Sequence, residues 1–241
     1  MKTIFLEKIR LTQYFALLFV IYGVIVVVMP NLKLSSGALT LFSVNSFLYG
    51  FYIAPILSAQ KARIEELHRI VRSEANAIFS MVIGLKRLPT KLRNDIQEHF
   101  IDYLNASISQ QRPAEGEENY EKLITYCLEY KGEHQEVVDK LLDKLVANQQ
   151  NRTNFSMQMT NKVYSNEWMI MLVLFSITLG FVLVLDAGAG YVYDFLSAFL
   201  CTGLTMLLVI LLKMSTLTHK KAKQVWEPYK QLVSSRFYRI D

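Results

Sequence analysis

Long stretches that are nearly free of charge and one long charged segment divide this chain of 241 residues. Each of the nearly uncharged stretches is about 18–22 residues long, which matches the ~30 Å hydrocarbon core of a bilayer. The four stretches are Leu11–Met29, Ala38–Ser58, Trp168–Leu185 and Tyr191–Leu212. The charged segment, residues 59–166, separates the first pair from the second. The pattern therefore predicts an all-α membrane protein with four transmembrane helices per protomer and a helical domain outside the bilayer.

The second stretch differs from the other three because polar and aromatic side chains interrupt it. The polar residues and the proline between Leu41 and Ala59 include Ser43, Asn45, Ser46, Tyr49, Tyr52 and Pro55. Polar atoms in hydrocarbon are costly unless protein or water surrounds them. We therefore expect one face of this helix to be turned away from lipid.

The second stretch also continues into the charged segment without a break. The residues from Ala59 to Leu88 include no proline, and apolar side chains recur every seven residues at Ile64, Val71, Ile78 and Leu85. This periodicity predicts one long helix that leaves the membrane and ends at Leu88-Pro89. Further helices are expected over 89–108, 119–131 and 133–167, with Val138, Leu141, Leu142, Leu145 and Val146 buried in the last. A polar loop is expected over 109–118.

Net charge is +5, and the basic residues gather beside the spans on one side. The positive-inside rule then puts both termini and the central segment in the cytoplasm of a multi-pass protein of the cytoplasmic (inner) membrane. Four parts are expected: an N-terminal transmembrane pair (1–58), a cytoplasmic helical domain (59–166), a transmembrane hairpin (167–213) and a basic-aromatic tail (214–241). Directly after a span, such a tail is better suited to the anionic leaflet than to nucleic acid, which we do not expect as a partner.

Catalytic and metal-binding patterns are absent from the sequence. The two cysteines, Cys127 and Cys201, have no plausible disulfide partner, and no cysteine–histidine cluster has the spacing of a zinc site. Glu65 and His68 have the spacing of half a di-iron site, but no second copy accompanies them, so an ion pair explains them better. We expect no cofactor and no enzymatic activity; a membrane enzyme is the weakest of the functions considered.

Two motifs resemble a known family. The segment Ser46–Ile53, SFLYGFYI, is similar to the second transmembrane helix of bestrophin anion channels. The segment Arg72–Ile78, RSEANAI, followed by Leu88-Pro89, Arg93 and Tyr103-Leu104, resembles the bestrophin-like domain family of bacterial membrane proteins. The acidic calcium-binding cluster of animal bestrophins has no counterpart here, so calcium gating is not implied.

The resemblance implies a homo-oligomer, a pentamer, built around the second transmembrane helix. The pore constriction would then fall on Ser43, Phe47 and Phe51, where Ser43 replaces an aliphatic residue and would widen the outer end. A cytoplasmic vestibule would follow, with Lys61, Arg63, Arg69, Arg72 and Glu74 as its expected residues. Phenylalanine rings can gate by dewetting and tolerate a passing anion, and a basic mouth would concentrate anions.

Each of these residues also has a plainer interpretation. Phe47 and Phe51 are equally suited to packing between helices, the basic residues to fixing the topology, and Glu74 to a solvated or paired carboxylate. Asn45 and Tyr49 lie away from the expected pore face and are placed to bond neighbouring helices. The first hypothesis is an ion channel that prefers anions such as chloride; the alternative is a non-conducting membrane scaffold or sensor whose cytoplasmic helices bind a partner.

Overall fold

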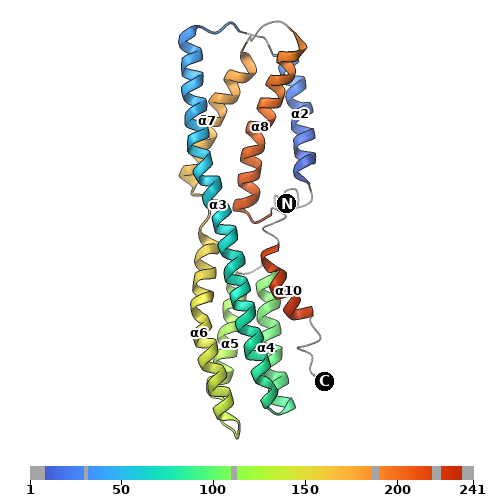
Figure 1. The fold of residues 1–241 in the computed structure, drawn as a ribbon, viewed down its shortest axis with the longest axis vertical. Helices are drawn as coiled ribbons and strands as arrows, with labels where there is room; N and C mark the ends of the chain where they lie inside the picture. Colours follow the sequence, from blue (N-terminus) through green and yellow to red (C-terminus); the bar gives the residue numbers. More distant parts are fainter. Residues whose placement is uncertain (1–8, 30–31, 110–112, 186–189, 219–223, 235–241) are drawn as a thin grey trace. The chain divides into compact units, whose positions relative to one another are not determined.

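The computed structural model describes residues 9–29, 32–109, 113–185, 190–218 and 224–234 (Figure 1). Helices make up almost all of these residues. They are α2 (Leu11–Val28), α3 (Ser36–Gly84), α4 (Thr90–Ser109), α5 (Pro113–Glu129), α6 (Gln135–Thr160), α7 (Ser165–Val184), α8 (Tyr191–Ser215) and α10 (Glu227–Ser234), with short 3-10 turns η1 (Leu85–Arg87) and η2 (Gln224–Trp226). The expectation of an all-α fold is confirmed.

The chain forms two compact units. The membrane unit comprises Met1–Ile64 and Lys162–Ala222, and the helical unit comprises Glu65–Asn161 and Lys223–Asp241. Helix α3 contributes its first part to the membrane unit and the remainder to the helical unit. The change of unit falls between Ile64 and Glu65, inside α3.

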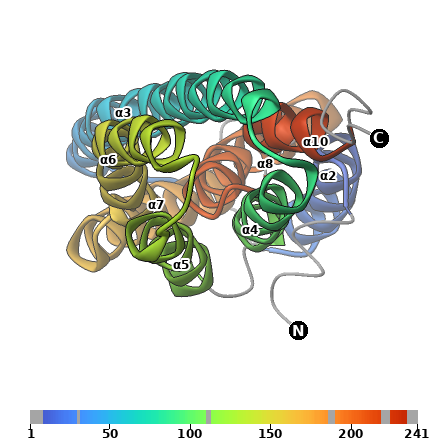
Figure 2. The same cartoon turned by 90° about the horizontal axis from the view of Figure 1, so that it is seen from below.

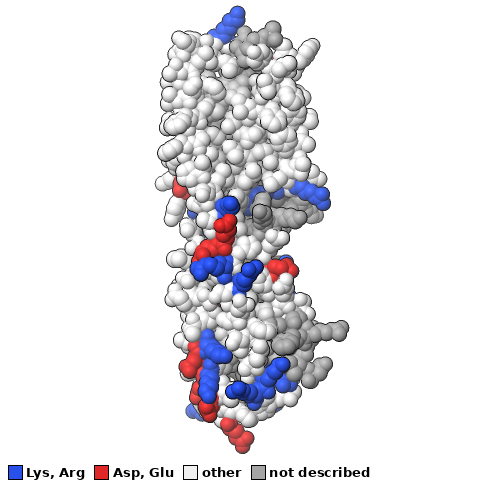
Figure 3. All heavy atoms as spheres, viewed as in Figure 1, with Lys and Arg blue, Asp and Glu red and all other residues white. Residues whose placement is uncertain are grey.

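The membrane unit consists of α2, the first part of α3, α7 and α8. The four expected spans are confirmed as helices that are long and apolar enough to cross a bilayer. Helices α2 and α8 pack closely, with Phe15 edge-on to Phe199 and Phe19 edge-on to Phe195. The face of this unit that Figure 3 shows is almost entirely free of charged side chains, as contact with hydrocarbon requires.

Gly190 begins α8 in a conformation that suits glycine. Its φ angle is +130°, in the region that side chains with a Cβ atom rarely adopt. The glycine therefore lets the chain turn directly into the last span.

The helical unit has an apolar core built on the seven-residue stripe of α3. Leu67, Val71, Ile78 and Leu85 are all buried there, as the periodicity predicts. Helices α4 and α5 pack against each other, and α10 packs on α4 (Figures 1 and 2). Burying each of these large side chains stabilises the fold by about 1.5–3 kcal/mol.

Three details differ from the sequence expectations. Helix α5 begins at Pro113, within the expected polar loop, because proline suits the first turn of a helix. Helices α6 and α7 are separate, since residues 161–164 leave the helix and the Glu167 carboxylate accepts a hydrogen bond from the Tyr164 N–H, 2.9 Å away. Val146, expected in the core, is 57% exposed.

The C-terminal segment also differs from the expected surface tail. Residues 224–234 belong to the helical unit, where Val225, Trp226 and Tyr229 are buried. Trp226 packs edge-on against Phe155 of α6 with ring centroids 5.4 Å apart. The aromatic residues of this segment thus complete a protein core, while residues 219–223 and 235–241 lie outside the described part.

Candidate functional site

The expected constriction residues lie together on an exposed face of α3 in the membrane unit. Phe47 and Phe51 are 69% and 70% exposed, and their rings stack with centroids 6.0 Å apart. Ser43, one turn earlier, is also exposed, and its hydroxyl donates to the Leu39 carbonyl of its own helix. No other element of the described membrane unit covers these three residues.

A proline removes one backbone hydrogen bond on this face. Pro55 lies inside α3, four residues after Phe51, and proline has no N–H to donate to the Phe51 carbonyl. Because Phe51 and Pro55 are both exposed, the oxygen lies on the exposed face. In hydrocarbon, a carbonyl without any donor costs several kcal/mol, whereas water can supply one.

The opposite face of α3 is anchored to the other spans. Asn45 donates to the Leu174 carbonyl (2.9 Å) and to the Thr178 hydroxyl (2.8 Å) of α7. The Tyr49 hydroxyl donates to the Leu204 carbonyl of α8 (3.3 Å). The sequence-based expectation that Asn45 and Tyr49 bond neighbouring helices is confirmed. The polar residues of this span are therefore divided between an anchored face and an open face.

The residues expected in a basic vestibule have different environments. Lys61 and Arg72 are exposed. Arg69 is exposed as well and forms a salt bridge with Glu66 at 2.6 Å. Arg63, by contrast, is only 4% exposed and donates to Gln60 and to the Ser215 carbonyl, so it packs inside the membrane unit and does not contribute to a basic surface.

Glu74 differs most from its expected place, since it lies in the interior of the helical unit. Its side chain is completely buried, and its carboxylate accepts hydrogen bonds from the hydroxyls of Tyr103 on α4 and Tyr229 on α10. It therefore cannot line an open vestibule. It serves as an acceptor that joins α3 to two helices distant in the sequence.

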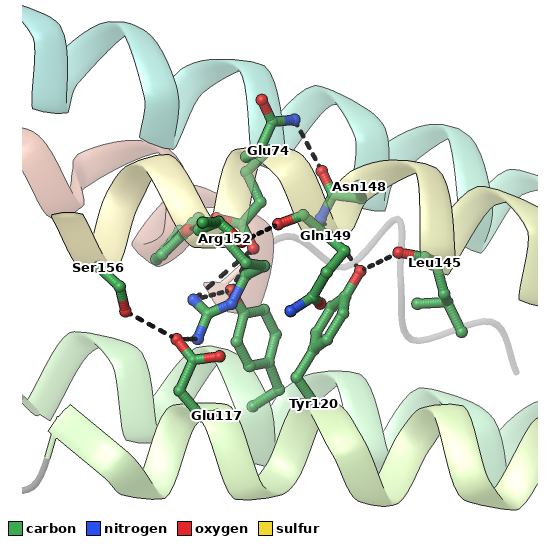
Figure 4. Close-up of polar contacts among 12 residues, drawn as sticks. Glu74, Glu117, Tyr120, Leu145, Asn148, Gln149, Arg152 and Ser156 are labelled. Atoms are coloured by element: carbon green, nitrogen blue, oxygen red, sulfur yellow. Dashed lines mark hydrogen bonds and ion pairs between the residues drawn. The ribbon is translucent and has the colours of Figure 1, made fainter. Parts of the chain in front are cut away.

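Arg152 of α6 supplies the positive charge of this cluster (Figure 4). Its guanidinium lies 3.8 Å from the Glu74 carboxylate, donates to Tyr103 at 2.6 Å and bonds Glu117 of α5 at 2.8 Å. It also lies over the rings of Tyr103 and Tyr120. Five helices of the unit, α3 to α6 and α10, thus contribute charged or aromatic side chains to one buried site.

Burial controls the ionisation of this cluster. It raises the pKa of Glu74 above the ordinary 4.5, and the opposing effects of Arg152 and the two tyrosine hydroxyls offset this only in part. Burial also raises the pKa of Tyr120 to about 12. Sequence reasoning did not connect these residues, although Asn148 and Arg152, one turn apart in the apolar stripe of α6, indicate a buried polar partner.

A groove of about 720 Å³ lies beside the cluster, between α3 and the η2–α10 segment. Its polar lining includes His68, Arg72, Asn76, Glu227 and Gln231. Within the described residues, no group of three or more histidine, cysteine or acidic side chains has the geometry to hold a metal ion.

The four long apolar helices define a multi-pass α-helical membrane protein. The family model described as Bestrophin-like domain matches residues 13–219. The chain therefore belongs to the bestrophin-like family, whose members are membrane proteins related to anion channels. A search of curated proteins found no match, and a search of solved structures found none either.

Proposed function

We propose that this protein is an oligomeric ion channel of the cytoplasmic membrane that prefers anions, with α3 lining the pore. Membership of the bestrophin-like family supports the class. The observation that carries the proposal is the exposed face of α3 with Ser43, Phe47 and Phe51, where Pro55 also removes the helical N–H partner of the Phe51 carbonyl. A carbonyl that lacks its helical partner is better suited to a water-filled path than to lipid, so this face is better suited to a pore than to a bilayer.

Phe47 and Phe51 would form the constriction of this pore. When several copies surround an axis, the stacked rings on each α3 become successive apolar rings, which resist wetting and therefore resist ion passage. Ser43 would keep the outer end polar. The residues of this face are mostly small or aromatic, including Gly50, Ala54 and Ser58, whereas a lipid-facing surface needs no such selection.

Anion preference is argued from charge and from the family. Lys61 is exposed close to the end of the apolar part of α3, and Arg72 is exposed in the helical unit. Positive side chains at the mouth of a pore raise the local concentration of anions. Because Arg63 is buried, we assign this role to the exposed basic residues Lys61, Arg69 and Arg72.

The test is a recording of single-channel currents from purified protein in planar bilayers. We expect Phe47→Ala combined with Phe51→Ala to raise the conductance, because two apolar rings are removed from the narrowest part. Leu48→Ala is the matched control, since Leu48 is exposed on the same helix about 100° away from Phe47 and should leave conductance unchanged. In a chloride gradient, the current should reverse close to the chloride equilibrium potential.

Two results would overturn the proposal. Protein that passes no current in the parent or the Phe47→Ala/Phe51→Ala form would instead favour a non-conducting scaffold or sensor. The second result is a dimer in light scattering on the detergent-solubilised protein. Five copies of the 27.8 kDa chain can surround an axial path, whereas two copies leave none.

A further inference from the structure

The polar contacts on the anchored face of α3 determine which side of this helix meets its neighbours. Asn45 precedes Phe47 by two residues, and Tyr49 precedes Phe51 by two, so each pair is separated by about 200° around the helix. Asn45 reaches α7 and Tyr49 reaches α8. The two anchors therefore engage two different helices from the side opposite the phenylalanines.

Apolar packing alone is a weak constraint on such a rotation. Lipid tails are as apolar as the side chains of a span, so an apolar helix face gains little by contacting protein instead of lipid. Around Tyr49, the buried residues Ile53, Met171 and Leu211 are all apolar. The hydrogen bonds are directional and have no partner in lipid, so they discriminate between orientations of α3 where apolar contacts do not.

Both side-chain N–H groups of Asn45 have an acceptor. Its side-chain nitrogen has two hydrogens, and two acceptors lie at 2.9 and 2.8 Å. The Thr178 hydroxyl accepts from Asn45 and donates to the Leu174 carbonyl at 3.0 Å, so both residues bond the same carbonyl oxygen. Thr178 is 2% exposed, which excludes water as a replacement partner.

We propose that Asn45 and Tyr49 are positioning residues that fix the rotation of α3 about its own axis, and so hold Phe47 and Phe51 on the open face. If the protein is the channel proposed above, this rotation keeps the constriction in shape, and to that extent the proposal rests on the proposed function. The rotation of α3 itself can be measured without any current.

The experiment measures how fast a membrane-impermeant thiol reagent labels single cysteines in liposomes. The background carries Cys127→Ala and Cys201→Ala, because these are the two native cysteines. Phe47→Cys reports the open face, and Ile53→Cys, at a position 2% exposed, reports the anchored face. Labelling of Ile53→Cys requires a rotated α3, so its rate measures the population of that state.

Loss of the anchors should raise the rate at Ile53→Cys. Thr178→Val removes one hydrogen bond between spans besides a bond within α7, and one bond between spans is worth about 0.6 kcal/mol, which corresponds to about a threefold faster labelling. Asn45→Ala removes two and should give about a tenfold rise. Adding Thr178→Val to Asn45→Ala should give no further rise, because the partner is already gone.

Matched controls separate positioning from general destabilisation. Thr178→Ser keeps the hydroxyl and should retain the parental rate. Ser176→Ala removes an exposed hydroxyl of α7 that bonds only the Leu172 carbonyl of its own helix, and it should also have no effect.

Two outcomes would overturn the proposal: an unchanged rate at Ile53→Cys in both Asn45→Ala and Thr178→Val, or an equal rise in Ser176→Ala. If Asn45→Ala does not give a monodisperse protein, Thr178→Val, the milder change, decides alone. Slow labelling of Phe47→Cys in the parent would count against the channel instead, and the comparison at Ile53→Cys would still decide the role of the anchors.

Discussion

At the level of single residues, the helical unit depends on one buried carboxylate and its partners. Glu74 accepts two tyrosine hydroxyls and faces Arg152, and Arg152 also bonds Glu117. Isolated buried charges are very costly, whereas a buried charge with a counter-charge and hydrogen-bond partners is tolerated. The glutamate of the RSEANAI motif is thus explained by its contacts within the helical unit.

The first prediction concerns the pH dependence of stability. Between pH 4.5 and the raised pKa of Glu74, the folded protein holds a proton that the unfolded chain has lost. Stability should therefore fall as pH rises through this window and level off above it. Glu74→Gln is neutral at every pH and should remove this fall in a series of thermal melts.

The matched control for this prediction is an exposed carboxylate. A hydrogen bond from Lys140 lowers the pKa of Glu136, so Glu136→Gln should keep the falling profile of the parent. An identical pH profile in Glu74→Gln and the parent would contradict the assignment.

The second prediction concerns the positive charge of the cluster. Arg152→Met leaves the buried Glu74 carboxylate without a counter-charge, and removing one partner of a buried pair costs about 3–5 kcal/mol. Chemical denaturation followed by the fluorescence of Trp226, which packs against Phe155, would measure the loss. Arg69→Met should have little effect, because Arg69 is an exposed member of a surface pair.

At the level of elements, the last helix depends on its contacts with the rest of the helical unit. Helix α10 spans Glu227–Ser234, eight residues, and an isolated helix of that length is not stable in water. Trp226 and Tyr229 bury their rings, and Tyr229 donates to Glu74. These contacts hold the segment in place beside the groove along α3.

The third prediction tests this docking. Trp226→Ala, combined with Tyr229→Phe, removes both contacts, so the segment after residue 223 should become sensitive to limited proteolysis while the membrane unit stays intact. Gln231→Ala, an exposed position on the same helix, should remain as resistant as the parent. Equal resistance in the double variant would show that other contacts hold α10.

The sequence predicted the elements better than the partners of their side chains. Hydrophobic length and seven-residue spacing located the four spans and the course of α3, because these patterns are local. The partners of Glu74 come from four other helices, and no local pattern links residues 74, 152 and 229. For the same reason, Trp226 and Tyr229 were expected at a membrane surface: a basic-aromatic segment has the same composition whether it meets lipid or protein.

The division of α3 into two faces was predicted in part. The family resemblance indicated Phe47 and Phe51, and helix geometry placed Asn45 and Tyr49 elsewhere. The acceptors in α7 and α8 follow only from the packing of the spans. The burial of Arg63 was not foreseen, since a basic residue beside a span is usually exposed on the positive side of the membrane.

At the level of the whole molecule, the distribution of basic residues predicts how the chain is oriented in the membrane. Both termini and the helical unit are expected in the cytoplasm, because the basic residues gather beside those ends of the spans. The fourth prediction follows: alkaline phosphatase, which is active only outside the cytoplasm, should be active when fused after Lys33 and inactive when fused after Lys131. The reverse pattern would require the opposite orientation and would remove Lys61 from the cytoplasmic mouth.

The bond between Tyr229 and Glu74 has a consequence for biosynthesis. The two residues are 155 positions apart in the sequence. During translation, Glu74 therefore emerges long before Tyr229 and has only part of its partners until α10 leaves the ribosome. A chain stopped before residue 229 would hold an incompletely bonded carboxylate that quality-control proteases can detect as local unfolding.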